Sequence, residues 1–411
     1  MSTSEAIAIT GAGAVTAVGV GAKTLTDRWL AGECGIEDGC AACRDFDPHE
    51  YLGRKEVRRT DRFTQLALVA GDDALGQAGW LSGTPYEPER VACMIGTGIG
   101  GVSTLETEYT KLMARGAQAI SPLTIPMMMP NSPAGYMVMR HGWRGSSYAV
   151  SAACATGGHA IAAATRMIQV GDADAVVVGA SDAGITPLGL GAFEAMGAVS
   201  PSGRSLPFDA RRDGFVMGEG AGTLILERAE NAKARGAQIL GEILGYGTTT
   251  DAYHITAPDP QAHGATRAIQ LALKDAHIKP SQITYVNAHG TGTELNDRSE
   301  TIALKQALGP HAHTTPISST KSAIGHLLGA AGVVEAVATI HALRKNQLGP
   351  TTGYEQPDPD LDLDYIPHTR PLPTNHKPHI ALSNAFGFGG HNVVICLQVN
   401  PELAPSAGEE G

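Results

Sequence analysis

The stretch 148–171, YAVSAACATGGHAIAAATRMIQVG, decides the fold of this chain. Its short apolar run at 148–150 is typical of the end of a buried strand. Beyond Cys154 the apolar residues recur at helical spacing; they are Ala160, Ile161, Ala164, Met167 and Ile168. The stretch therefore predicts a strand, a sharp turn that carries Cys154, and a helix that begins close to this cysteine.

The surroundings of Cys154 suit a reactive thiol. Its neighbours are nearly all Ala, Gly, Ser or Thr, which leaves room for another molecule to approach. A cysteine at a helix N-terminus lies in the positive end of the helix dipole, which favours the nucleophilic thiolate. A free cysteine is more often a small buried hydrophobic residue, so the local pattern leaves both interpretations open.

The length of the chain indicates more than one structural unit. Its 411 residues exceed what a single core usually supports. The segment 316–343, PISSTKSAIGHLLGAAGVVEAVATIHAL, repeats the order of strand, serine-rich bend and small-residue helix seen around Cys154. Such an echo suggests a duplicated αβ unit. We expect one half at 1–239 and a second half at 240–411.

Composition excludes several classes of function. The net charge of -11 does not indicate the basic surface that nucleic-acid binding requires. The N-terminus lacks the basic and apolar regions of a signal peptide, and no apolar run reaches membrane-spanning length. We therefore expect a soluble, cytoplasmic protein that binds neither nucleic acid nor membrane.

The six cysteines do not form a secreted disulfide framework in a chain of this size. Cys34, Cys40 and Cys43 cluster near His49, but their spacing fits no standard zinc pattern, so we expect no metal site there.

Two features point to possible surfaces for partners. The densest basic cluster, Arg54, Lys55, Arg58, Arg59 and Arg62, stands at the start of a helix predicted over 58–79. A solvated face is the usual meaning of such a run, and a docking site for an acidic partner is the alternative. The three methionines at 127–129 fit either a subunit-facing wall or ordinary core packing.

Periodicity places the other elements. Buried strands are predicted at 6–10, 91–95, 173–180, 223–226, 239–246, 283–288 and 317–318, and helices at 229–236, 262–276 and 297–308. A glycine-rich turn is predicted at 383–392.

Three sharp turns beside glycines each deliver a reactive side chain. They carry Cys154, His289 in NAHGTGTELND and His326 in STKSAIGHLLGAAG. A thiol with one histidine would suggest a protease-like pair. Two neutral imidazoles beside a thiol suit a different task, because each can donate Nε2–H to a developing enolate oxygen.

Six segments together resemble the β-ketoacyl-acyl carrier protein synthases, the condensing enzymes of the thiolase-like superfamily. They are ITGAGAVTAVG, SAACATGGHAI, DGFVMGEGAG, NAHGTGTELND, SSTKSAIGHLLGAAG and NAFGFGGHN, and they span nearly the whole chain. The resemblance is nearest to the FabF-like elongating branch, with ketosynthases of type II polyketide systems as close neighbours. It implies an α/β, thiolase-like fold in which two duplicated halves form five αβαβα layers around a site between them.

The resemblance also implies a reaction and its residues. Cys154 would take an acyl group from acyl carrier protein as a thioester. His289 and His326 would stabilise the enolate formed when a malonyl thioester loses carbon dioxide, and the enolate would attack the Cys154 thioester. Lys321 would support the histidines electrostatically, with Glu300 as its partner and as a structural support. No redox or organic cofactor is needed.

Further residues follow from motif positions in the resemblance. The amides of Cys154 and Phe388 would form the oxyanion hole, and Phe388 would gate substrate entry. Thr291, Thr293 and Phe386 would bind substrate, with the threonines on the phosphopantetheine arm. A structural monovalent cation occurs in some relatives at positions matching Asn287, Glu335, Ser383 and Asn384. The implied partners are acyl carrier protein and a second subunit, in a homodimer or a heterodimer with a related chain.

The sequence departs from the family pattern at three positions. Many relatives have Arg where Gly197 and Leu206 stand, and Thr where His391 stands. These changes put the carrier partner and the acyl preference in doubt.

Three functions therefore remain in view. The first is an elongating synthase of fatty acid synthesis. The second is a polyketide ketosynthase that works with a subunit lacking the cysteine. The third is a non-catalytic chain-length subunit, against which Cys154 itself argues.

Overall fold

The computed structural model describes residues 6–372 and 378–402. Its strands are β1 (Ile7–Thr16), β2 (Gly19–Val20), β3 (Val91–Gly96), β4 (Ser147–Tyr148), β5 (Ala175–Asp182), β6 (Gly220–Arg228), β7 (Gly241–Thr250), β8 (Tyr285–Asn287), β9 (Ile317–Ser318), β10 (Gln347–Leu348), β11 (Arg370–Pro371), β12 (His379–Gly387) and β13 (His391–Val399).

The helices lie between these strands, singly or in groups. They are α1 (Ala22–Leu30), α2 (Pro48–Tyr51), α3 (Arg54–Val57), α4 (Arg62–Ala78), α5 (Val102–Arg115), α6 (Thr124–Met128), α7 (Ser132–His141), α8 (Thr156–Gln169), α9 (Pro187–Ala195), α10 (Ala229–Ala234), α11 (His263–Asp275), α12 (Glu294–Leu308), α13 (Lys321–Ile324) and α14 (Ala331–Arg344).

The strand order repeats within the described residues. The first set runs β4-β3-β5-β6-β1 and the second runs β9-β8-β12-β13-β7. In each set the first three strands are parallel and the last three pair antiparallel. A short pairing of β1 with β7 joins the two sets into one hydrogen-bonded sheet. This repetition confirms the predicted duplication.

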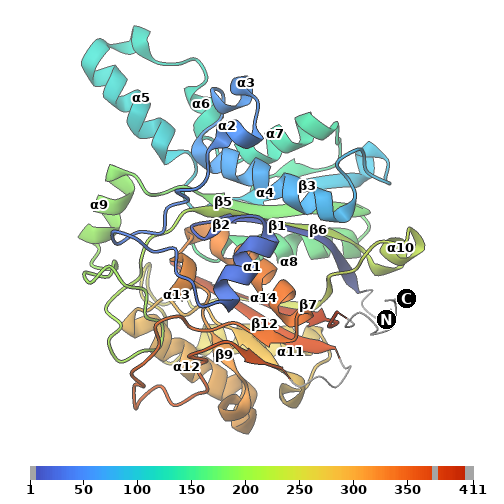
Figure 1. Ribbon diagram of the computed structural model, residues 1–411, viewed down its shortest axis with the longest axis vertical. Coiled ribbons are helices and arrows are strands. Elements are labelled where there is room, and N and C mark those ends of the chain that lie inside the picture. The colour runs from blue at the N-terminus through green and yellow to red at the C-terminus, as the bar shows by residue number, and fades with distance from the viewer. Residues whose placement is uncertain (1–5, 373–377, 403–411) are drawn as a thin grey trace, which may run out of the picture.

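The two sets of strands and the helices make five layers (Figure 1). Helices α4 and α7 cover the outer face of the first set, and α11 and α12 cover that of the second. Helices α8 and α14 lie between the sets, where α8 packs on β5 and α14 packs on β12. The αβαβα architecture predicted from the resemblance is confirmed.

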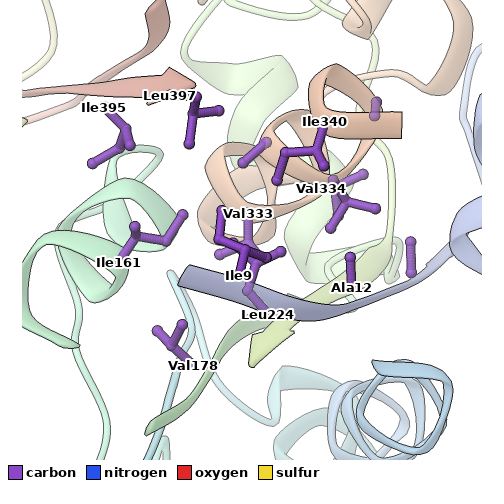
Figure 2. Packing of buried hydrophobic residues seen from close by; sticks show 14 of the residues in the cluster. Ile9, Ala12, Ile161, Val178, Leu224, Val333, Val334, Ile340, Ile395 and Leu397 are labelled. Atoms are coloured by element: carbon purple, nitrogen blue, oxygen red, sulfur yellow. The ribbon is translucent and has the colours of Figure 1, made fainter. Parts of the chain in front are cut away.

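The central layer explains the composition of its helices. Thirteen of the fourteen residues of α14 are buried, and α8 carries alanine and glycine where the two helices meet the sheets. A helix covered on every side is apolar all round, because no face of it is left for water. Figure 2 shows Ile161 of α8 and Val333, Val334 and Ile340 of α14 packed among strand residues such as Ile9 and Leu224.

Three details of the expected fold are wrong. The run at 148–150 is not the end of a buried strand, because among the described strands β4 pairs only with β3, and Tyr148 is 42% exposed. The helix predicted over 58–79 starts at Arg62, because Asp61 caps it by accepting a hydrogen bond from the Phe63 amide. The predicted turn at 383–392 is only three residues long, since β12 continues to Gly387 and β13 begins at His391.

Across residues 6–372 and 378–402, no helix has both the length and the apolar character needed to cross a bilayer.

Candidate active site

A cavity of about 550 Å³ lies where the two halves meet, and Cys154, His289 and His326 all line it. Thr291, Thr293, Phe386 and Phe388 also line this cavity. Lys321 and Glu300 are not in the lining; both are buried behind it. The structure thus brings the sequence-predicted residues together from four separate turns.

Cys154 stands on a strained turn between β4 and α8. Ala153 has a φ of +48°, in the left-handed region that non-glycine residues rarely adopt. The Thr156 hydroxyl braces this turn, because it donates to the Ala153 carbonyl at 2.7 Å and accepts from the Ala152 amide at 2.8 Å. Strain held by its surroundings in this way is typical of functional turns.

The end of β12 lies directly against this turn, at Gly387. A Cβ atom on Gly387 would lie 2.9 Å from the Ala152 oxygen and 2.9 Å from the Ala155 nitrogen, so only glycine fits. The close approach turns two backbone N–H groups, those of Cys154 and Phe388, toward the cysteine sulfur. These are the two groups that the sequence resemblance assigns to an oxyanion hole.

The resting thiol is protonated. Burial raises the pKa of Cys154 to about 12, and this effect exceeds the opposing influence of the Lys321 charge and of the two N–H groups. The helix N-terminus favours thiolate, as expected from the sequence, but burial has the larger effect on the pKa of Cys154. Desolvation outweighs the helix dipole because the sulfur is almost fully removed from water.

Both histidines are neutral, as the sequence predicts. Burial is the first cause that lowers the pKa of His289 and of His326 well below the usual range, and the nearby Lys321 charge is the second. The two rings lie 5.4 Å apart, centroid to centroid. A neutral imidazole has one donor nitrogen and one acceptor nitrogen, so its partners decide which is which.

Those partners place the proton on Nε2 in both rings. The Leu328 amide lies 3.2 Å from His326 Nδ1, and Lys321 Nζ lies 3.3 Å from His289 Nδ1. An amide N–H and an ammonium group can only donate, so each Nδ1 is an acceptor. Two Nε2–H donors therefore belong to the rings that line the cavity.

Lys321 has a different partner from the one expected. Its Nζ donates to Glu335 Oε1 at 2.5 Å and to the His289 carbonyl at 2.6 Å. The pairing of Lys321 with Glu300 is wrong, because Glu300 faces the other side of the 289–290 turn. Glu335 lies on α14, where the sequence offers no local signal for a partner.

Glu300 supports the turn that carries His289. Its carboxyl oxygens accept from the His289 and Gly290 amides, both at 2.8 Å, and from Asn384 Nδ2 at 3.0 Å. Burial raises the pKa of Glu300 to about 7. The expectation of a structural support agrees with these contacts.

Sequence reasoning missed a second support of this turn. Asp297 is fully buried and accepts from the amides of Phe208 and Thr291 at 2.7 and 3.1 Å. It ties the threonine-bearing turn to the segment after α9. The only signal for it was its place at the end of the NAHGTGTELND motif.

The cavity also has apolar lining residues that the sequence analysis did not identify. They are Phe193, Met196, Phe215 and Leu328. The Phe215 ring contacts both Phe193 and His326, with centroids 5.5 and 5.3 Å away. Thr291 and Thr293 also line the cavity, and their hydroxyl oxygens are 2.9 Å apart. The apolar residues thus suit an aliphatic chain and the two hydroxyl groups suit a polar linker.

The four positions matching a cation site in relatives carry oxygen donors. Asn287 of β8 is in register with Ser383 of β12. Asn287 Oδ1, Glu335 Oε2 and Asn384 Oδ1 are buried and have no hydrogen-bond partner among the residues that the structure describes. Buried polar atoms without partners are rare, and such oxygens suit a hard cation. The residues present therefore fit the group.

Cys34 and Cys43, which cluster in the sequence, make hydrogen bonds to different parts of the chain. Cys43 Sγ donates to the Glu219 carbonyl at 3.3 Å, and Cys34 Sγ donates to the Ser322 carbonyl at 3.5 Å. Within the described residues, no group of three or more His, Cys, Asp or Glu side chains could hold a metal ion.

Comparison with known proteins agrees with this geometry. The family profile described as "Beta-ketoacyl synthase, N-terminal domain" matches residues 4–232, and "Beta-ketoacyl synthase, C-terminal domain" matches residues 240–355. A 3-oxoacyl-(acyl-carrier-protein) synthase 2 from Synechocystis is 46% identical and aligns with 95% of this chain and 97% of its own. The protein of the same name from Staphylococcus aureus is 40% identical, with 97% and 99% covered.

Solved structures add ketosynthases to these relatives. A type II polyketide synthase acyl carrier protein in complex with its ketosynthase superposes with a TM-score of 0.88 at 32% identity, over 96% of this chain and 99% of the other. A β-ketoacyl synthase from Burkholderia phymatum gives a TM-score of 0.86 at 32% identity, with 96% and 99% covered. Matches over both halves of the chain, together with the thiol and two-histidine cavity, establish that this chain belongs to the β-ketoacyl synthase family.

Proposed function

We propose that the chain is a 3-oxoacyl-(acyl-carrier-protein) synthase that lengthens acyl chains in fatty acid synthesis. The observation that carries the proposal is the cavity in which Cys154 faces two histidines that each hold their proton on Nε2. Relatives that carry this name are 40–46% identical and align over nearly their whole length.

In the first step, Cys154 accepts the acyl group. Its sulfur attacks the thioester carbonyl of an acyl carrier protein, and the carrier's pantetheine sulfur leaves with the proton that the cysteine thiol gives up. The N–H groups of Cys154 and Phe388 donate to the oxyanion that forms on the carbonyl. Because the resting thiol is protonated, this transfer of the proton to the leaving sulfur is part of the step.

In the second step, a malonyl thioester takes the place of the first carrier. The Nε2–H groups of His289 and His326 donate to its thioester carbonyl oxygen. The bond to the carboxylate carbon breaks, carbon dioxide leaves, and the electron pair becomes an enolate held by the two donors. The enolate carbon attacks the Cys154 thioester, and the cysteine sulfur leaves as a thiolate that takes a proton from solvent. A 3-oxoacyl product remains on the carrier.

The remaining residues position the substrates. Thr291 and Thr293 line the polar side of the cavity, where their hydroxyls would hold the amide groups of the phosphopantetheine arm. Phe386 and Phe388 close the cavity beside Cys154, and Phe388 would gate entry. Lys321 acts through His289, whose carbonyl and Nδ1 it contacts. No organic cofactor takes part in these steps.

The basic cluster is the proposed docking surface for the acidic carrier. Arg54, Lys55, Arg58 and Arg59 are exposed, and in the described part of the chain none of them forms an ion pair. Unpaired cations on one face attract an acidic partner and steer it. Arg62 does not belong to this surface, because its guanidinium binds the buried Glu219.

The proposed assembly is a dimer. Within the described residues, strand β4 leaves one edge unpaired, and Tyr148 on it is 42% exposed; Met129 and Ile125 are exposed apolar residues as well, at 39% and 60%. A second copy of this chain, or a related subunit, would cover these groups. The proposed halves are 1–239 and 240–411, in line with the repeated strand order.

A monovalent cation bound by Asn287, Glu335, Ser383 and Asn384 is also proposed. It would give partners to the three unpaired oxygens and would stabilise the junction of β8, β12 and α14.

A second candidate function is the ketosynthase of a type II polyketide system. Its support is the similarity to such ketosynthases, including a ketosynthase/chain length factor structure with a TM-score of 0.89 at 29% identity. The higher identity to the fatty acid enzymes favours the first candidate.

Mass spectrometry of the intact protein tests the proposal. After mixing with a medium-chain acyl carrier protein, the protein should gain one acyl group on Cys154, and malonyl carrier protein should then release it as a 3-oxoacyl product. Cys154→Ala should fold and accept no acyl group. Undiminished acyl transfer by that variant would refute the assignment, and no acylation of the wild type at any chain length would favour the polyketide candidate.

A further inference from the structure

A buried carboxylate that none of these steps uses lies close to the nucleophile. Asp182 is the last residue of β5 and is 0% exposed. Its Oδ1 accepts from Thr97 Oγ1 at 2.6 Å and from the Ile99 amide at 3.2 Å. Its Oδ2 accepts from the amides of Gly98 at 2.9 Å and Gly329 at 2.7 Å. Four donors occupy the acceptor sites of one ionised carboxylate.

The backbone around Asp182 is packed for this group. A Cβ atom on Gly329 would lie 2.5 Å from the Gly98 nitrogen and 2.7 Å from Asp182 Oδ2. A Cβ atom on Gly98 would lie 3.1 Å from the same oxygen. The two glycines therefore let two distant turns, at 97–100 and 326–330, close on one carboxylate.

One of these turns carries His326. The Leu328 amide donates to His326 Nδ1, and the amide of the next residue, Gly329, donates to Asp182 Oδ2. Leu328 has a φ of +50°, which a leucine holds only when its neighbours impose it. The bond from Gly329 to Asp182 is a contact that can impose it, and it thereby keeps the Leu328 donor aimed at the imidazole.

Asp182 also acts on Cys154. Its negative charge opposes ionisation of the thiol, whereas the Lys321 ammonium and the amides of Cys154 and Phe388 favour it. Burial has a larger effect on the pKa of this thiol than any of these charges or hydrogen bonds. The charge of Asp182 thus adds to the effect of burial, and both oppose ionisation of the Cys154 thiol.

We propose that Asp182 is a positioning residue for both steps of the reaction. Its carboxylate holds the turn after His326 so that Nε2 carries the proton, and its negative charge lies beside the turn that carries Cys154, where the space at Gly98 is bounded by both Asp182 Oδ2 and the Ala153 oxygen. The inference rests on the proposed function for the role of His326.

The test is Asp182→Asn, which keeps the shape but loses the charge and one acceptor oxygen. Decarboxylation of malonyl carrier protein should fall about tenfold or more, because a charged hydrogen bond to the turn is lost. Iodoacetamide should modify Cys154, identified by peptide mass, along a pH profile shifted to lower pH. A purely structural role would not produce this shift toward greater thiol acidity.

Two further variants separate the causes. Asp182→Glu keeps the charge but displaces the oxygens, so decarboxylation should fall while the thiol profile stays at the wild-type pH. Asp73→Asn is the control, because the half-buried Asp73 also accepts from a backbone amide, that of Ala22 at 2.8 Å, and does not line the cavity. It should change neither readout.

The proposal is overturned if Asp182→Asn leaves the thiol profile unmoved, or if Asp182→Glu decarboxylates at the wild-type rate. If Asp182→Asn does not fold, the decarboxylation rate of Asp182→Glu alone tests the proposal. The alkylation profile needs no carrier protein, so it tests Asp182 even if the wild type proves unable to condense acyl chains.

Discussion

The chemistry of single residues here is governed by burial more than by local charge. Cys154 and Glu300 both hold their protons more tightly than the free side chains do, because each is removed from water. His289 and His326 are neutral for the same reason. An enzyme that must stabilise a nascent enolate benefits from neutral donors in a dry cavity, because their hydrogen bonds strengthen as the charge develops.

Glu300 should leave a signature in the pH dependence of stability. Its pKa in the folded chain is about 7, against 4.5 for the free side chain, so its contribution to stability is greatest below pH 4.5 and declines up to about pH 7. The stability deficit of Glu300→Gln relative to wild type should therefore shrink as pH rises from 5 to 7, by about 1.4 kcal/mol per unit at most.

Urea unfolding of both proteins at four pH values measures this difference. Glu294→Gln, at an exposed position of the same helix, is the control. A deficit that grows with pH would contradict the raised pKa.

At the scale of elements, the site depends on how closely β12 approaches the cysteine turn. Gly387→Ala should lower acylation of Cys154 by at least about tenfold, because the new methyl group would displace the Phe388 amide from the sulfur. Gly135→Ala, inside α7 with open space around the new atom, should leave acylation unchanged and stabilise the fold by up to about 1 kcal/mol. Acylation rates from intact mass decide the matter, and equal rates for the two variants would contradict the oxyanion role.

The start of α4 combines a buried ion pair with a solvated surface. Arg62 binds Glu219, which is only 4% exposed, so Arg62→Met should destabilise the fold by about 3 kcal/mol because it leaves a buried carboxylate unpaired.

Arg59→Met should change stability by no more than about 0.5 kcal/mol, yet it should raise the KM for carrier protein. Chemical denaturation and steady-state kinetics separate these effects. A loss of stability in Arg59→Met would place this residue in the fold instead of the docking surface.

At the scale of the whole molecule, the exposed edge of β4 predicts association. Tyr148→Glu should give monomers, because a charge at the edge opposes pairing with a second strand. Tyr253→Glu is the control, since Tyr253 is 59% exposed in a loop away from this edge. Sedimentation velocity measures both variants, and a Tyr148→Glu dimer of unchanged affinity would exclude this edge as the interface.

The sequence alone indicated the helix after Cys154 and three candidate reactive residues. Apolar spacing marked α8, and glycine-flanked turns marked Cys154, His289 and His326, because turns and amphipathic periods depend on residues that are close along the chain. The resemblance to condensing enzymes then supplied the layers and the reaction, since it rests on six motifs spread over nearly the whole chain.

Tertiary structure alone decided the partners and the protonation states. The sequence paired Lys321 with Glu300, but the fold brings Glu335 to it. Local context favoured a Cys154 thiolate, but burial by distant segments protonates it. The contacts of Asp182 could be identified only in the folded chain, where the turns at 97–100 and 326–330 both donate to its carboxylate. Such contacts join residues far apart in the chain, and desolvation is the sum of everything packed around a group, so neither can be read from neighbours in sequence.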